Sequence, residues 1–395
     1  MVDALPARGV ADRLIAPLRP RLAQLRPHRP LMFDRLLFLP FDPVIVVPED
    51  WSPTSPTVPR TLLAPVAEAM RQALGPLATE IEAIIRGCTT ADLAVIEEAG
   101  RRLWPAAANA ITAIDANPAD WRKHALPRAL TTVIPAVAGV LAQASTVQAL
   151  IARAATGESV TAPALMSILD CGARRDAGCY GMLLTLLLSQ LPRPDEVLRM
   201  LAVNGTGSAV TRAAAERAVD TVLDAVDRDT GNAAALDAVN LGEAGAELAR
   251  LVGLLDGLEA EGQRPQVPGG LLGGTDRAER QGRIAGMRRR LETACRSRFE
   301  AGLAGELLLP MLSLPADAGS AEIVRLEDTA RELRRLEICG RRLGGQEGYG
   351  RMLNATAAEV RGMRGNAALT LADRVRIVEI LAGPDDALAL LLAGE

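Results

Sequence analysis

The side chains that most often carry out chemistry are scarce in this chain of 395 residues. It contains two histidines, one lysine, nine aromatic residues and five scattered cysteines. Histidine and lysine serve as general acids, bases and nucleophiles, and histidine and cysteine bind most zinc ions. Asp, Glu and Arg are plentiful, but they form no recognisable catalytic or metal-binding motif. We therefore predict no catalytic residue, no metal ligand and no cofactor-binding residue from the sequence.

One short segment does bring chemically useful side chains together. Trp121, Lys123 and His124 lie between two turn signals, beside Asp120 and Arg122. A histidine base and a lysine cation could serve a small-molecule site here. No second catalytic group is identifiable nearby, so we favour an exposed helix end that is anchored by its tryptophan.

The strongest basic cluster lies in residues 276–298, where eight arginines stand against three acids. Its central members, Arg283, Arg288, Arg289 and Arg290, could form a surface for an anion or a partner. No aromatic residue is interleaved among them, which argues against a surface for stacked bases. A charged run is usually the solvated face of a helix, and this is the interpretation that we favour.

The chain before this cluster has the opposite charge. Residues 220–261 hold ten acids and two arginines. Two apolar stripes accompany the two charged stretches, one through residues 241–258 and one through residues 284–294. We therefore expect the two stretches to pack as an antiparallel pair of helices, so that the arginines are largely neutralised within the fold. A third apolar stripe runs through residues 323–336.

Two cysteines and three glycine motifs were also considered as sites. Cys171 and Cys179 bracket the sequence GARRDAG, whose arginines could lower a thiol pKa. The spacing matches no zinc or thioredoxin motif, so the sequence leaves open whether this pair is redox-active. The glycine motifs at 205–207, 269–274 and 344–350 lack the preceding strand or the Lys-Ser/Thr pair of nucleotide-binding loops, so we assign none of them to a nucleotide.

The elements that must position these residues are predicted to be helices. Alanine and leucine supply most of the apolar residues, and both are strong helix formers. We predict an all-α fold, an irregular multi-helix bundle or helical array with a proline-rich N-terminal arm and C-terminal hairpin helices. The sequence does not decide between a solenoid and a compact bundle, because no fixed repeat is present.

We expect three parts: the arm over residues 1–60, a central helical bundle over 61–230 and the C-terminal hairpin region over 231–395. The arm contains six prolines between residues 40 and 59 and one strand-like run, residues 44–47. Its phenylalanines and leucine, Phe33, Leu37, Phe38 and Phe41, are predicted to be buried against the central helices.

The sequence predicts a cytoplasmic location. Residues 1–21 contain no apolar signal segment, and the odd cysteine count argues against a disulfide framework. Residues 129–152 carry no charge and are long enough to cross a bilayer, but they are too polar to insert well. We expect a buried central helix there and no membrane span. The strong preference for arginine over lysine favours a bacterial source.

These observations favour a non-enzymatic interaction or scaffold protein that binds another protein through helical surfaces. The first alternative is an enzyme or ligand-binding protein whose Asp/Glu/Arg site is formed by long-range packing. The second is a regulator that contacts nucleic acid through the arginine-rich helix, residues 277–298, which we disfavour. A deep polar pocket lined by converging carboxylates would favour the enzyme, and a broad concave or exposed apolar surface would favour the scaffold. An uncompensated positive face around Arg288–Arg290 would favour nucleic acid. Oligomeric state is not readable from the sequence.

Overall fold

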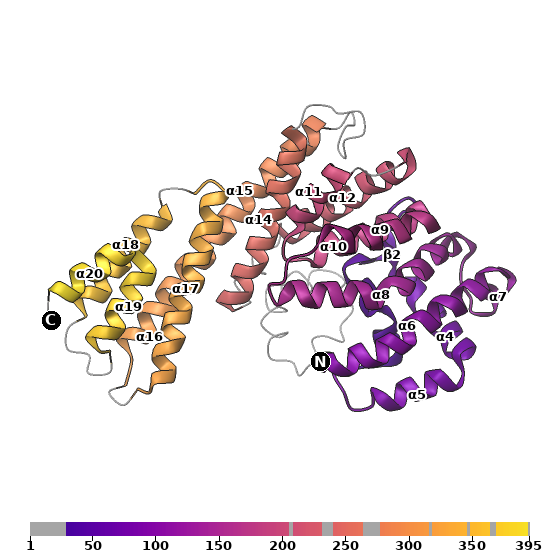
Figure 1. Ribbon diagram of the computed structural model, residues 1–395, viewed down its shortest axis with the longest axis horizontal. Coiled ribbons are helices and arrows are strands. Elements are labelled where there is room, and N and C mark those ends of the chain that lie inside the picture. The colour runs from indigo at the N-terminus through magenta and orange to yellow at the C-terminus, as the bar shows by residue number, and fades with distance from the viewer. Residues whose placement is uncertain are drawn as a thin grey trace, which may run out of the picture. The chain divides into compact units, whose positions relative to one another are not determined.

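Helices make up nearly all of the regular structure, as the alanine- and leucine-rich composition predicts. The computed structural model describes residues 29–204, 208–230, 240–263, 277–315, 318–345, 348–363 and 369–393. The first helices are short, and longer ones follow (Figure 1): α3 (Phe33–Phe38), α4 (Leu63–Leu74), α5 (Pro76–Ile84), α6 (Leu93–Asp115), α7 (Ala119–Lys123), α8 (Ile134–Ala155), α9 (Ala162–Arg175), α10 (Ala177–Gln190), α11 (Pro194–Asn204) and α12 (Ala209–Thr230).

The remaining helices complete the chain: α14 (Leu241–Gln263), α15 (Arg277–Gly302), α16 (Leu309–Leu312), α17 (Ser320–Arg342), α18 (Gly348–Gly362), α19 (Leu371–Ala382) and α20 (Pro384–Leu392). A π-helical segment, Leu303–Leu308, joins α15 to α16. Pro310, the second residue of α16, cannot donate a backbone hydrogen bond, which suits a widened turn at this point. The all-α prediction is confirmed.

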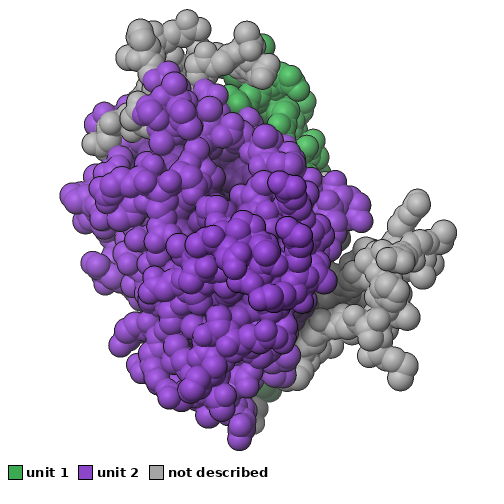
Figure 2. All heavy atoms as spheres, turned by 90° about the vertical axis from the view of Figure 1, so that its right-hand side faces the viewer, with its two compact units in different colours: residues 1–25, 226–255, 278–395 green, residues 26–225, 256–277 purple. Residues whose placement is uncertain are grey.

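The chain forms two compact units, coloured separately in Figure 2. Of the described residues, those within 26–225 and 256–277 form unit 2, and those within 226–255 and 278–395 form unit 1. Within the described residues the chain passes between the units three times, within α12, within α14 and at the start of α15. The three-part division expected from the sequence stays a prediction.

Strand is confined to the neighbourhood in which it was expected. Among the described residues, β1 (Ile45–Val46) pairs in parallel with β2 (Val58–Pro59), with Ile45 opposite Val58 and Val46 opposite Pro59. The sequence did not predict β2 or the isolated bridge between Pro30 and Thr89. Prolines limit both strands, because Pro48 begins the next turn and Pro59 cannot donate to a ladder.

The described part of the N-terminal arm is packed into unit 2. Phe33, Leu37, Phe38 and Phe41 are all buried, in contact with helices that include α4, α6, α8 and α10, so this prediction is confirmed. The indole Nε1 of Trp104, on α6, donates a hydrogen bond of 2.9 Å to the carbonyl oxygen of Leu36. Aromatic anchors and one buried hydrogen bond therefore fix the arm to the helices.

Helix α8 is the central helix of unit 2. Together with the 3-10 turn before it, Arg128–Val133, it is long and apolar enough to cross a membrane. However, 61% of its most apolar window is buried within the structure, where it packs against α6, α9 and α10. This is the packing of a core helix, as the sequence predicted.

Unit 1 is built on the three predicted apolar stripes. The stripe residues of α14, α15 and α17 are buried throughout: Leu241, Ala244, Leu248, Leu251, Leu255, Ile284, Met287, Leu291, Ala294, Ile323, Leu326, Ala330, Leu333 and Leu336. A Cβ placed on Gly302 would lie 2.7 Å from Leu241 and 3.3 Å from Leu333. The start of α14 therefore lies against the end of α15, as an antiparallel hairpin requires, and α17 packs beside both (Figure 1).

Candidate functional site

The arginine-rich cluster lies on α15, and the fold engages most of its central guanidinium groups. Arg288 donates a hydrogen bond of 3.0 Å to the backbone carbonyl of Arg342, at the end of α17. Arg290 forms an ion pair with Asp227 of α12. Arg283 also interacts within the fold, whereas the side chain of Arg289 is exposed.

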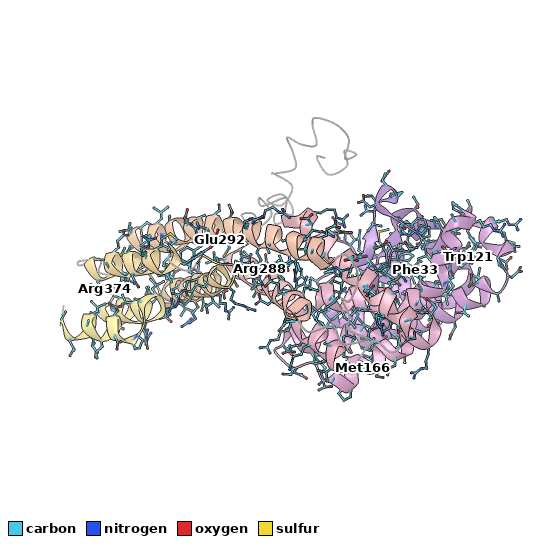
Figure 3. The ribbon with its side chains drawn as sticks, turned by 90° about the horizontal axis from the view of Figure 1, so that it is seen from above. Phe33, Trp121, Met166, Arg288, Glu292 and Arg374 are labelled. Atoms are coloured by element: carbon cyan, nitrogen blue, oxygen red, sulfur yellow. The ribbon has the colours of Figure 1, made fainter. Side chains whose placement is uncertain are left out.

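The later arginines of α15 are paired as well. Arg296 pairs with Glu292, one turn earlier, at 2.5 Å, and its guanidinium lies 5.8 Å from the ring centre of Tyr349. Arg298 is buried and pairs at 2.6 Å with Glu306 of the π-helical segment. Figure 3 labels Arg288 and Glu292 on this helix. The cluster is therefore a set of engaged side chains rather than one open cationic surface.

The three residues of the possible small-molecule site differ in their exposure. Trp121 is fully buried on α7, and its indole lies beside the carboxyl group of Asp115. Lys123 lies two residues further on, has 73% of its side chain exposed and pairs with Asp120 at 2.5 Å. His124 is half-buried at the C-terminal end of α7. The buried Trp121 anchors this helix end, and whether the segment binds a small molecule stays a prediction.

Cys171 and Cys179 lie in different environments. Cys171 is half-buried, with its Sγ 3.1 Å from a guanidinium nitrogen of Arg174. Cys179 is fully buried, and burial raises the pKa of its thiol to about 12, with a further rise from the Asp176 carboxylate. A thiol with this pKa stays protonated at neutral pH and is a poor nucleophile.

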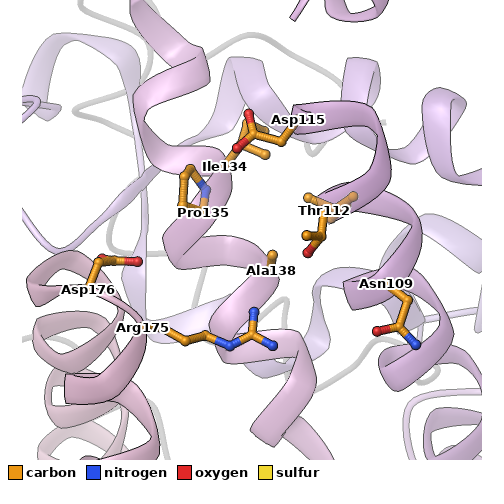
Figure 4. A pocket seen from close by; sticks show the side chains of 9 residues that line it. Asn109, Thr112, Asp115, Ile134, Pro135, Ala138, Arg175 and Asp176 are labelled. Carbon is orange, nitrogen blue, oxygen red and sulfur yellow. The ribbon is translucent and has the colours of Figure 1, made fainter. Parts of the chain in front are cut away.

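A polar cleft of about 390 Å³ opens between α6, α8 and the junction of α9 with α10 (Figure 4). Its polar lining comes from Asn109, Thr112, Asp115, Arg175 and Asp176. Its apolar lining comes from Ile111, Ile134, Pro135 and Ala138. The lining residues come from separate helices, so long-range packing forms this cleft.

The junction between α9 and α10 positions Arg175 and Asp176. Asp176 alone separates the two helices, in an extended backbone conformation, and its carboxylate accepts a hydrogen bond of 2.7 Å from the backbone N–H of Cys179. It is therefore the N-cap of α10. Gly139 of α8 lets this junction approach, because a Cβ there would lie 2.3 Å from Cys179 Sγ and 3.1 Å from Arg175 Cδ.

Asp115 lies at the end of the cleft away from Arg175 (Figure 4). Burial raises the pKa of its carboxyl group, and the neighbouring Trp121 indole opposes that rise. Among the described residues, no ion pair joins Arg175 to Asp115 or Asp176. No group of His, Cys, Asp and Glu that could hold a metal ion is present in the described part of the chain.

A second candidate site is the apolar outer face of α20 in unit 1. Leu388, Leu391 and Leu392 have 53%, 52% and 77% of their surfaces exposed. Ala387 and Leu390 of the same helix are buried, and α20 packs against α19. Some apolar side chains of α20 therefore pack within unit 1, and others are exposed to solvent.

Neither site was named from the sequence. Arg175 and Asp176 lie inside the segment between Cys171 and Cys179, but we considered that segment only as a thiol environment. Asp115 and Asn109 are single polar residues on an amphipathic helix, where nothing local distinguishes them from solvated side chains. The run of leucines that ends α20 could have indicated the second site, because its spacing places leucine on more than one side of the helix.

Of the three glycine motifs, those at 205–207 and 269–274 lie outside the described residues. The third lies at the connection between α17 and α18, where a Cβ on Gly345 would lie 2.7 Å from both Glu292 Oε1 and the Tyr349 ring. Close packing accounts for this glycine. Comparison with known proteins gave no match to a protein-family model, a curated protein or a solved structure.

Proposed function

We propose that this protein is a non-enzymatic helical interaction protein, and that it binds an apolar helix of a protein partner on the outer face of α20. The carrying observation is the exposure of Leu388, Leu391 and Leu392, which are spaced by three and four residues and so form one side of a helix. Exposed apolar patches on soluble proteins mark surfaces that bind other molecules.

The rest of α20 supports this proposal because the fold already holds the helix in place. Ala387 and Leu390 are buried, and Asp386 pairs with Arg361 of α18 at 2.5 Å. The exposed leucines are therefore not needed to attach α20 to its own unit. A prefolded helix with a free apolar side binds a partner helix without first being ordered, which lowers the entropic cost of association.

The cleft in unit 2, lined by Asp115, Arg175 and Asp176, favours binding of a small ligand as a second function. The nucleic-acid alternative stays disfavoured, because Arg288, Arg290, Arg296 and Arg298 have partners within the fold. The cytoplasmic location and the bacterial source stay predictions.

Photo-crosslinking tests the proposal directly. A photoreactive amino acid is placed at Leu391 of the full chain in its native cell, and in a second strain at Val203. Val203 is the matched control, since it is 74% exposed and lies on α11 in unit 2. We expect a discrete protein adduct at position 391 only, lost when Leu388 and Leu392 are changed to serine. No adduct at 391, or the same adduct at both positions, contradicts the proposal.

A further inference from the structure

The charged residues that line the cleft in unit 2 are Arg175, Asp115 and Asp176. Asp176 caps α10, and the positive end of that helix compensates its charge. Arg175 and Asp115 form no ion pair with each other, and Figure 4 shows them at opposite ends of the cleft, with Ala138 and Thr112 between them. Two unlike charges held apart across a cavity match a molecule that carries both charges.

The two charged side chains lie on different helices, and this keeps them apart. Arg175 is the last residue of α9, and its stem lies over Gly139 of α8, which has no side chain to displace it. Asp115 is the last residue of α6 and lies near the buried Trp121. Because different helix ends carry them, the backbone holds the two side chains apart before a ligand enters.

The lining also argues against other ligands. A phosphate would find a single guanidinium and two carboxylates, so repulsion would offset its one strong contact. An uncharged molecule would leave Arg175 and Asp115 without partners while removing water from them, which is unfavourable. The volume of about 390 Å³ is in the range of small-molecule sites.

We propose that this cleft binds a small zwitterion, an amino carboxylate whose carboxylate is held by Arg175 and whose ammonium group is held by Asp115. Arginine binds a carboxylate through two parallel N–H···O bonds, and a partly desolvated carboxylate favours a cationic partner. Asn109 and Thr112 add neutral polar contacts along one wall, and Ile134, Pro135 and Ala138 contact the methylene groups of the ligand.

A chain-length series measures the separation of the two charges. Glycine, β-alanine, 4-aminobutyrate and 6-aminohexanoate are titrated into the full-length protein by calorimetry, beside hexanoate, hexylamine and inorganic phosphate. We expect one chain length to bind most tightly, and hexanoate and hexylamine to bind at least about tenfold more weakly than that best amino carboxylate. Absence of binding by every amino carboxylate, or tighter binding of phosphate, overturns the proposal.

Two variants test which residue binds the carboxylate of the ligand and which binds its ammonium group. Arg175→Gln should abolish binding, and Asp115→Asn should reduce the affinity for the best amino carboxylate to that of the plain carboxylate of equal length. Arg174→Gln and Asp170→Asn are the controls, because both residues are exposed on α9 and neither lines the cleft. Arg175 is exposed and Asp115 half-buried, so the test variants should fold, which circular dichroism verifies. An equal loss in the control variants overturns the assignment.

Discussion

At the residue scale, Gly139 is the position where one added methyl group should matter most. Gly139→Ala would place its Cβ 2.3 Å from Cys179 Sγ, so α8 and α10 would have to separate. We expect the variant to lose about 1–3 kcal/mol of unfolding free energy, the usual cost of an overpacked core. Urea unfolding followed by circular dichroism measures this.

Gly282→Ala is the matched control for that substitution. Gly282 also lies in a helix, α15, and a Cβ there meets nothing within 4 Å. This variant should be more stable than the wild type by about 0.5–1 kcal/mol, because alanine favours the helix. If both glycine variants shifted the unfolding free energy in the same direction, close approach at Gly139 would not be the reason for its glycine.

Buried thiols and a buried phenol predict the alkaline stability of the protein. Burial raises the pKa of Cys179, Cys295 and Tyr180 to about 12, above their values in the unfolded chain. The unfolded chain therefore loses these protons first as the pH rises. We expect the unfolding free energy to fall between about pH 9 and 12, by at most about 1.4 kcal/mol per pH unit for each group.

Cys179→Ala tests one of these contributions. The variant should show a shallower loss of stability over the same pH interval, measured by urea unfolding at each pH. Thr185→Ala is the control, because Thr185 is buried on the same helix and does not titrate. It should lower the unfolding free energy by a similar amount at every pH, so a changed slope in this control would refute the explanation.

The sequence was least informative about which individual residues come together in a site. The sequence predicted the burial of Phe33, Phe38 and Phe41, because aromatic residues in a proline-rich segment have few other roles. It did not predict that Asp115 and Arg175 line one cleft, because this depends on the angle between helices that are far apart in sequence. Local spacing carries no information about such angles.

At the element scale, the N-terminal arm should be essential to unit 2. Phe41 is fully buried, and its ring packs edge-on against Phe38 with ring centres 6.1 Å apart. Phe41→Ala should lower the unfolding free energy by about 3–5 kcal/mol through lost burial and the cavity left behind. Met32→Ala, at a position that is 54% exposed, should change it by less than about 0.5 kcal/mol in the same measurement.

The basic helix α15 makes a second prediction at this scale. Since Arg288 and Arg290 are engaged by Arg342 and Asp227, few guanidinium groups remain to neutralise phosphates. We expect no retention of a random DNA duplex or of single-stranded RNA at about 0.15 M salt. Micromolar binding with a steep salt dependence, abolished by changing Arg288, Arg289 and Arg290 together to alanine, would restore the nucleic-acid alternative.

Elements were largely predictable from the sequence, for physical reasons that the structure makes clear. The stripes of α14, α15 and α17 are buried because a three- and four-residue spacing of leucines leaves one helix side that water disfavours. The π-helical segment Leu303–Leu308 and the second strand, Val58–Pro59, were missed. Both depend on local geometry around prolines, which composition and periodicity do not specify.

At the scale of the whole molecule, the path of the chain between the two units predicts which shorter fragment is the more stable one. Residues 256–263 belong to unit 2, where a Cβ on Gly257 would lie 3.0 Å from Asp195 and Leu198 of α11. A fragment of residues 1–225 lacks this part of α14, so the buried Leu198 would lose contacts. We expect it to melt at a lower temperature than a fragment of residues 1–263, as measured by circular dichroism. Equal melting temperatures would contradict this.

Lys123 has a practical consequence for binding experiments on this protein. It is the one lysine of the sequence, its side chain is exposed, and it lies on the short helix whose tryptophan neighbours Asp115. An amine-reactive dye applied to this protein has a single ε-amino group to label. A fluorophore there would lie on the helix whose Trp121 neighbours Asp115, so that binding in the cleft can be followed by emission without introducing a cysteine.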